Sequence, residues 1–78
     1  MNIQYFPDTD TLYIQLTDNY VVDTQELNEN TIIDLDEDGN LVAMTLEHAQ
    51  KMANIHQFSF QQVYATPQTR KEHMAMAA

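Results

Sequence analysis

The chain has 78 residues and a mass of 9.0 kDa, which is enough for one small domain and not for two independent cores. Twelve acidic and three basic residues give a formal net charge of -9, which excludes autonomous binding to the phosphate backbone of nucleic acids or to an anionic membrane surface. The chain has no cysteine, which excludes disulfides, thiolate metal sites and thiol nucleophiles.

We expect a soluble, unsecreted protein of the cytoplasm. The longest apolar stretch is a few residues long, far below the roughly 18 residues that a membrane span requires. The N-terminal residues, MNIQY, have no basic region, apolar core or cleavage site of a signal peptide. The absence of cysteine fits a reducing compartment.

Alternation between apolar and polar residues predicts strands over residues 2–6 and 11–16. Residues 7–10 (PDTD) between them predict a turn, because proline presets φ and aspartate side chains hydrogen-bond the nearby backbone. The two segments therefore predict an antiparallel hairpin. The side chains expected on its apolar face are Ile3, Tyr5, Leu12, Ile14 and Leu16.

Three further strands are predicted over residues 20–27, 31–35 and 41–46. The first of these is β-prone at its start and increasingly polar, as expected of a half-exposed edge strand. Residues 36–40 (DEDGN) join the other two in a tight hairpin, in which Gly39 suits the positive φ that such a loop demands. The side chains expected on the inner face are Ile33, Leu35, Val42, Met44 and Leu46.

The pattern changes at residue 47. Residues 47–53 are good helix formers without β-branched residues and predict a short helix packed on one face of the sheet. Aromatic residues alternate over residues 58–64, which predicts a sixth strand, with a helical turn as the alternative. The chain is therefore predicted to form one α+β domain over residues 1–64, an antiparallel β-meander of five or six strands with one short helix. We expect the C-terminal tail, residues 65–78, to be a frayed helix or disordered.

The pattern Asp34-x-Asp36-x-Asp38-Gly39 matches the first half of a calcium-binding loop. The second half differs, because the twelfth position is Thr45 instead of a bidentate glutamate and the flanking segments predict strands instead of helices. The simpler interpretation is an exposed hairpin turn, where aspartate and glycine are favoured for backbone reasons. A calcium- or metal-responsive module that uses this hairpin is kept as an alternative function.

No other set of residues indicates a metal-binding or catalytic site. The three histidines, His48, His56 and His73, include no pair with the i, i+4 spacing of a zinc site on one helix. Ser59 is the only serine and lies between two phenylalanines, without a nucleophile elbow. The carboxylates crowd turns where water keeps them ionised. We expect no catalytic residue, cofactor or metal site; a small enzyme, with a perturbed carboxylate or His48 in a dimer cleft, is the second alternative.

We expect an interface on the face of the sheet that lies opposite the predicted core. Tyr13 lies opposite the Leu12 and Ile14 side chains on its strand. A single sheet covered on one side by a short helix would leave this second face available to another subunit or protein. Because a 78-residue domain is marginally stable and gains stability by burying such a face, we expect a homodimer.

Residues 5–16, YFPDTDTLYIQL, resemble the opening hairpin of domain-of-unknown-function family 2283 (DUF2283), with its pattern Tyr-Asp-Pro-x-x-Asp-x-Leu-Tyr-Ile-x-Leu. Phe6 stands where the family often has aspartate. Residues 21–24, 32–42 and 46–49 resemble its later blocks, so the similarity extends from about residue 3 to residue 50. The resemblance implies a small bacterial β-meander followed by a helix, with no established activity.

The resemblance also implies a binding role, because genes of this family often lie beside short genes for basic, ribonuclease-like toxins. The charge distribution is compatible with such a role. Residues 1–50 contain eleven acidic residues and no lysine or arginine, whereas residues 51–78 carry a net charge of +2. This asymmetry steers a basic partner toward the first part of the chain. We therefore expect an acidic, antitoxin-like protein-binding module that recognises a basic protein.

Overall fold

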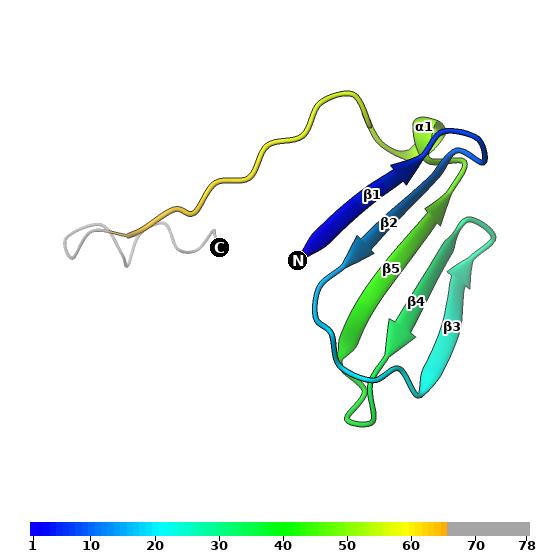
Figure 1. The fold of residues 1–78 in the computed structure, drawn as a ribbon, viewed down its shortest axis with the longest axis vertical. Helices are drawn as coiled ribbons and strands as arrows, with labels where there is room; N and C mark the ends of the chain where they lie inside the picture. The colour runs from blue at the N-terminus through cyan, green and yellow to red at the C-terminus, as the bar shows by residue number, and fades with distance from the viewer. Residues whose placement is uncertain (66–78) are drawn as a thin grey trace.

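Five strands form one antiparallel sheet in the computed structural model, which describes residues 1–65 (Figure 1). One short helix follows the last strand. The predicted antiparallel sheet with a short helix is therefore confirmed. The elements are β1 (Asn2–Phe6), β2 (Thr11–Gln15), β3 (Asp23–Asn28), β4 (Thr31–Leu35), β5 (Leu41–Glu47) and α1 (Ala49–Met52).

The strands lie in the order β1-β2-β5-β4-β3, so the last strand in sequence is the central one. Strands β3, β4 and β5 form a meander, and the β1–β2 hairpin adds to the other side of β5. This order departs from purely sequential pairing at one connection, residues 16–22, which crosses from β2 to the far edge of the sheet (Figure 1). Because these residues make the crossing, β3 begins at Asp23 and not at the predicted residue 20.

The register of the strands confirms most of the predicted apolar face. Leu16 lies after the end of β2, and Leu35 and Val42 lie at a register shift between β4 and β5, so the regular pairing does not include these three. One row of side chains across the sheet runs from Ile3 through Ile14 and Met44 to Ile33. Paired residues of antiparallel strands point to the same side, so alternate rows belong to one face. We define the apolar face as the side chains of Ile3, Tyr5, Leu12, Ile14, Ile33, Met44 and Leu46.

The opposite face is largely polar. Its central row contains Gln4, Tyr13, Thr45, Ile32 and Glu26. The position of Tyr13 opposite the apolar side chains, which the alternation predicts, is therefore confirmed. The two faces are chemically distinct because the side-chain period of a strand is two residues.

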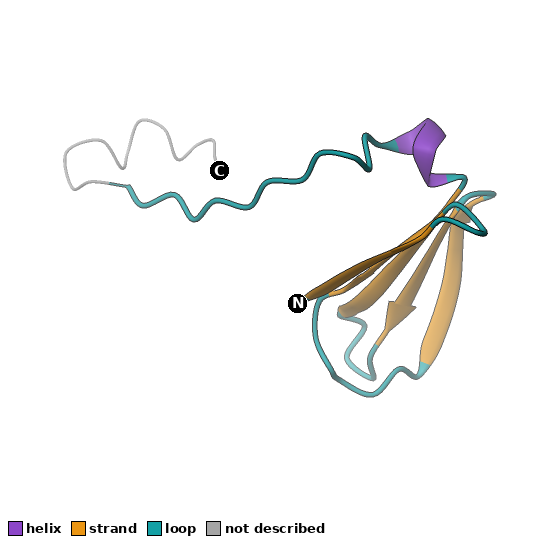
Figure 2. Ribbon diagram, turned by 45° about the horizontal axis from the view of Figure 1, so that its top comes forward, coloured by secondary structure: helices purple, strands orange, loops and turns teal. Residues whose placement is uncertain are grey.

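The helix is shorter than the predicted 47–53. Strand β5 continues to Glu47, and His48 has a left-handed backbone with φ 56°, so α1 begins only at Ala49. The helix lies at the end of the sheet, beside the turn between β1 and β2, rather than across a face (Figures 1 and 2). Four residues of helix extend only about 6 Å, so α1 leaves both faces of the sheet uncovered.

A local network holds α1 to the first hairpin. The Ala49 N–H donates to the carbonyl oxygen of Asp10 at 2.9 Å, and the Gln50 N–H donates to Asp10 Oδ1 at 3.1 Å. The Tyr5 hydroxyl donates to the same Oδ1 at 2.7 Å, a bond that raises the pKa of Tyr5 above its ordinary value. The turn between β1 and β2 therefore caps the start of the helix.

The predicted sixth strand over residues 58–64 is wrong. After α1 a turn brings the Gln57 N–H to the carbonyl oxygen of Asn54 at 3.3 Å, and the chain then continues as extended coil without pairing to the sheet. Figures 1 and 2 both show this segment leaving the sheet. Of the predicted tail, residues 66–78 lie outside the described residues. Within residues 1–65, no helix has the length and apolarity needed to cross a membrane.

Candidate protein-binding surface

The apolar face is half exposed instead of forming a covered core. Its members are partly accessible, and Ile3 is 37% exposed. In the described part of the chain, the buried apolar residues are Val42 on β5, Ala43 on β5 and Ala49 on α1, and no large side chain is fully buried. A sheet normally packs its apolar face against a second layer. Among the described residues no second layer is present, so this face stays uncovered within residues 1–65.

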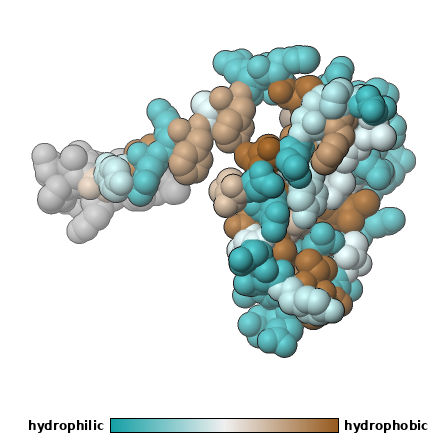
Figure 3. Space-filling view, in the orientation of Figure 1, coloured by the Kyte–Doolittle hydropathy of each residue, from teal (hydrophilic) through white to brown (hydrophobic). Residues whose placement is uncertain are grey.

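Acidic residues surround the apolar face without interrupting it. Most occur in the turns at both ends of the sheet and on the edge strand β3; β4 and β5 carry one each, and β1 and β2 contain none. Figure 3 shows hydrophilic residues at the two ends of the sheet and also among the apolar side chains between them. The acidic residues of this rim are Asp8, Asp10, Asp18, Asp23, Glu29, Asp36, Glu37 and Asp38, whereas Glu26, Asp34 and Glu47 lie on the opposite face.

A second exposed apolar group follows the helix. We define the aromatic arm as residues 58–64, in which Phe58, Phe60, Val63 and Tyr64 are 68 to 80% exposed. Residues 51–65 contain Lys51 and no acidic residue, so the arm differs in charge from the acidic sheet. The arm extends away from the sheet in both ribbon views (Figures 1 and 2).

The carboxylates of the predicted calcium loop serve separate structural roles. Asp36 is only 7% exposed, and its Oδ1 accepts the N–H groups of Asp38 and Asn40, each at 2.9 Å. Its Oδ2 accepts a bond from the Asn19 side chain at 3.1 Å. The Asn40 N–H is the main cause that lowers the pKa of Asp36. This carboxylate therefore closes the β4–β5 hairpin.

The other two aspartates of that pattern do not join Asp36 in a common site. Asp34 Oδ1 accepts a hydrogen bond from Thr24 Oγ1 at 2.8 Å across the β3–β4 pair, and Asp38 is exposed in the turn. In residues 1–65, no three histidine, aspartate or glutamate side chains converge to hold a metal ion. The simpler interpretation of the pattern, a hairpin turn built by aspartate and glycine, describes the geometry that is observed.

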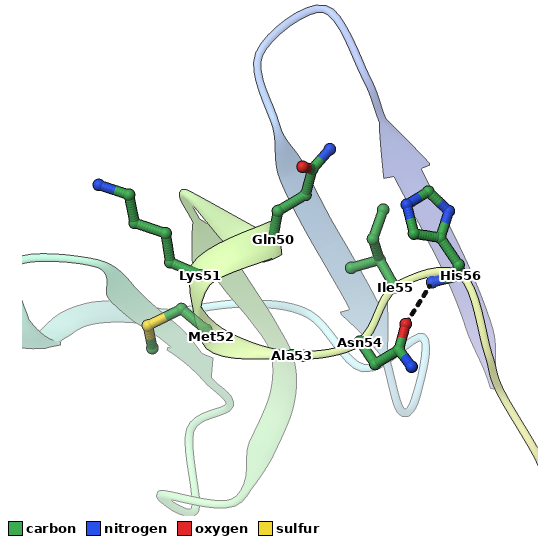
Figure 4. A pocket seen from close by; sticks show the side chains of 7 residues that line it. All are labelled: Gln50, Lys51, Met52, Ala53, Asn54, Ile55 and His56. Atoms are coloured by element: carbon green, nitrogen blue, oxygen red, sulfur yellow. Dashed lines mark hydrogen bonds between the residues drawn. The ribbon is translucent and has the colours of Figure 1, made fainter.

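The remaining candidate residues also lie apart. His48 Nδ1 is 2.9 Å from Asn30 Oδ1 at the end of the sheet. His56 lines an open hollow of about 470 Å³ beside α1, formed by the contiguous residues 50–56 (Figure 4). Its own N–H donates to Asn54 Oδ1 at 3.2 Å. Ser59 lies in the aromatic arm, and His73 lies outside the described residues. The described residues therefore bring no nucleophile and histidine together.

Sequence reasoning did not identify the contacts of Asp10, although this residue joins the first hairpin to α1. Its backbone has φ 55°, a conformation that aspartate adopts more readily than most residues. A turn aspartate forty residues before its partner Gln50 carries no local signal of that contact. The expectation that the helix covers the apolar face and leaves only the Tyr13 face open is wrong, because α1 has four residues and the apolar face stays accessible. The exposure of the aromatic arm was not predicted either.

Comparison with known families gives one match. The model of the family described as "Protein of unknown function (DUF2283)" matches residues 2–50, which covers all five strands and the start of α1. No curated protein matches the chain. No solved structure matches it either.

Proposed function

We propose that this chain, which belongs to the DUF2283 family, is a protein-binding module. The family has no assigned function, so the proposal is argued from the exposed surfaces of the chain. The uncovered apolar face is the observation that carries the proposal. A partner that covers this face removes apolar area from water, which stabilises the complex by about 25 cal/mol per Å². The same contact supplies the second layer that the sheet lacks.

The acidic rim selects the charge of the partner. Typical binding sites combine an apolar centre with a polar rim, and here every charged residue in positions 1–50 is acidic. Such a rim accelerates encounter with a basic protein and disfavours acidic ones. We therefore propose that the partner is basic, with an antitoxin-like role in the bacterial cytoplasm as the specific case suggested by the family resemblance.

The experiment compares two adjacent isoleucines on β4. Ile33 belongs to the apolar face, whereas Ile32 lies in the row of Tyr13 and Thr45 on the opposite face, and both are half-buried. The chain is co-expressed with the product of the neighbouring gene, and co-elution is measured by size-exclusion chromatography. We expect Ile33→Thr to weaken the complex at least about tenfold, and Ile32→Thr to leave it nearly unchanged.

Salt provides the second test. If the acidic rim attracts the partner, affinity falls as ionic strength rises, because salt screens exposed charges. Isothermal titration calorimetry of the purified pair at low and high sodium chloride measures this dependence. Failure to co-elute, equal weakening by Ile32→Thr, or an affinity indifferent to salt would contradict the proposal.

A further inference from the structure

The two edges of the sheet differ in charge. Strand β1 forms one edge and contains only uncharged residues, Asn2–Phe6, without proline. Strand β3 forms the other edge and carries Asp23 and Glu26. Edge strands expose unpaired N–H and C=O groups that another strand can join, and charged residues are a common protection against such pairing. The β1 edge therefore lacks the protection that the β3 edge has.

The aromatic arm has the composition of a strand without a partner. Its sequence, FSFQQVY, has no charge, proline or glycine, and Phe58, Phe60 and Tyr64 recur at even positions. Within the described residues, the backbone of 58–65 makes no backbone hydrogen bond. The arm is therefore extended, β-prone and unpaired in a single copy of the chain.

The arm does not pair with β1 of its own copy. Phe58 and Phe60 lie across a hollow of about 440 Å³ from Met1, Asn2 and Ile3, at the start of β1. The turn at residues 54–57 sends the following residues outward, and Figures 1 and 2 both show the arm extending away from the sheet. The arm is thus positioned to reach another molecule.

We propose that the aromatic arm of one copy adds as a sixth strand to the β1 edge of a second copy. Reciprocal addition by both arms closes a two-fold symmetric dimer. With Gln61 paired to Gln4 in an antiparallel register, Phe60 lies beside Tyr5 and Phe58 points to the same side, so the apolar face is extended by one strand. The predicted homodimer is thereby assigned a specific interface, one that does not depend on a basic partner.

Charge favours this arrangement over direct contact between two sheets. Residues 1–50 carry eleven acidic residues and no lysine or arginine, so two sheets brought together repel each other. The arm contains no acidic residue, and β1 is an edge without one. Pairing the arm with β1 therefore joins two uncharged segments, and the acidic turns need not meet.

The first experiment measures oligomeric state by light scattering coupled to size-exclusion chromatography over a range of concentrations, with the full chain. We expect the wild-type chain to dimerise. Phe58→Ser combined with Phe60→Ser removes the arm's apolar side chains, and Gln4→Lys places a charge on the β1 edge; each weakens dimerisation by at least about tenfold. The matched controls Gln25→Lys, on the β3 edge, and Met52→Ser, on α1, leave the dimer intact.

The second experiment distinguishes exchange between copies from closure within one copy. Because the chain has no cysteine of its own, any disulfide that forms must join the introduced cysteines. A chain with Gln4→Cys is mixed with a chain carrying Gln61→Cys under oxidising conditions. We expect a disulfide-linked heterodimer, and we expect the doubly substituted chain to form linked dimers instead of an internally bridged monomer.

Three results would overturn the proposal. The first is a wild-type chain that stays monomeric at high micromolar concentration, and the second is a dimer that is weakened as much by Gln25→Lys as by Gln4→Lys. The third is a monomer with an internal bridge between positions 4 and 61, which would place the arm on its own sheet. All three results leave the proposed binding of a basic protein untouched, because that proposal is tested with Ile33→Thr and Ile32→Thr.

Discussion

Single residues in the β4–β5 hairpin show how a pattern that resembles a metal site serves a turn. Asp36 accepts two backbone N–H groups with one carboxylate oxygen, and its own N–H donates to the carbonyl of Asn40 at 2.9 Å. Gly39 has φ +82°, and its N–H donates to the carbonyl of Asp36 at 3.0 Å. The turn therefore depends on one carboxylate and one left-handed glycine.

The stability supplied by Asp36 should depend on pH. Hydrogen bonds, chiefly from the Asn40 N–H, lower the pKa of Asp36 in the folded chain. A lowered folded-state pKa contributes stability above the unfolded value of about 3.9, and this contribution is lost as pH falls through the folded value. We expect Asp36→Asn to lower the melting temperature at neutral pH, with a difference from wild type that shrinks below about pH 4.

Thermal unfolding followed by circular dichroism between acidic and neutral pH measures this difference. Asp38→Asn is the matched control, because it removes the same charge from the same turn without removing an acceptor of those two N–H groups. A difference for Asp36→Asn that stayed constant across the pH range would show that the ionised carboxylate does not close the turn.

Gly39 provides a second prediction at this scale. A Cβ at position 39 meets no atom within 4 Å, so a substitution there costs only backbone strain. We expect Gly39→Ala to lower the free energy of unfolding by about 1 kcal/mol. Gly39→Asn should cost less, because asparagine tolerates the left-handed region. Urea denaturation of both variants tests this ranking, which equal costs would contradict.

At the scale of elements, α1 shows how a helix too short to be stable by itself is held in place. Helices this short do not persist in water without tertiary contacts. Here Ala49 is fully buried, and the backbone N–H groups of Ala49 and Gln50 donate to Asp10. The Gln50 side chain also donates to the Tyr5 hydroxyl at 3.1 Å. The helix therefore exists because the first hairpin lies beside it.

Removing the Asp10 carboxylate should release the helix and leave the sheet intact. We expect Asp10→Ala to cost about 2 kcal/mol of stability, through the lost hydrogen bonds and the strain of alanine at φ 55°. Amide hydrogen exchange should show faster exchange at Gln50, whose N–H donates to that carboxylate, with little change in β4 and β5. Asp8→Ala, in the same turn and exposed, serves as the control. Unchanged protection at Gln50 in Asp10→Ala would contradict this role.

For the molecule as a whole, the dominant features are an uncovered sheet and an unbalanced charge. No large side chain is fully buried within residues 1–65, so burial gives the described part of the chain limited stability. The eleven acidic residues of positions 1–50 repel one another, and that segment contains no lysine or arginine to offset the repulsion. Screening of this repulsion should therefore stabilise the folded chain.

We expect the melting temperature to rise with sodium chloride at low ionic strength and then to level off. Calcium chloride and magnesium chloride at matched ionic strength should raise it equally, because screening does not distinguish the two cations. A larger rise with calcium that Asp38→Asn abolishes would instead favour the metal-responsive alternative. Differential scanning fluorimetry of the wild-type chain and Asp38→Asn makes the comparison.

Most of the secondary structure follows from local patterns. Alternation with a period of two residues places Leu12 and Ile14 on one face and Tyr13 on the other, and the register confirms both. Proline, aspartate and glycine mark the hairpin turns at residues 7–10 and 36–40. These features could be predicted because they depend on residues a few positions apart. The apolar centre of the candidate surface follows from the same alternation.

The arrangement of the elements was decided by contacts between distant residues. The position of β5 between β2 and β4 depends on which strands pair, and alternation alone does not specify the partner. Residues 58–64 carry the same alternating signal as a true strand and yet remain unpaired. The sequence by itself therefore determined which segments are β-prone and which side chains share a face. Only the tertiary structure decided which edges and faces stay open, because strand pairing and burial depend on every other segment of the chain.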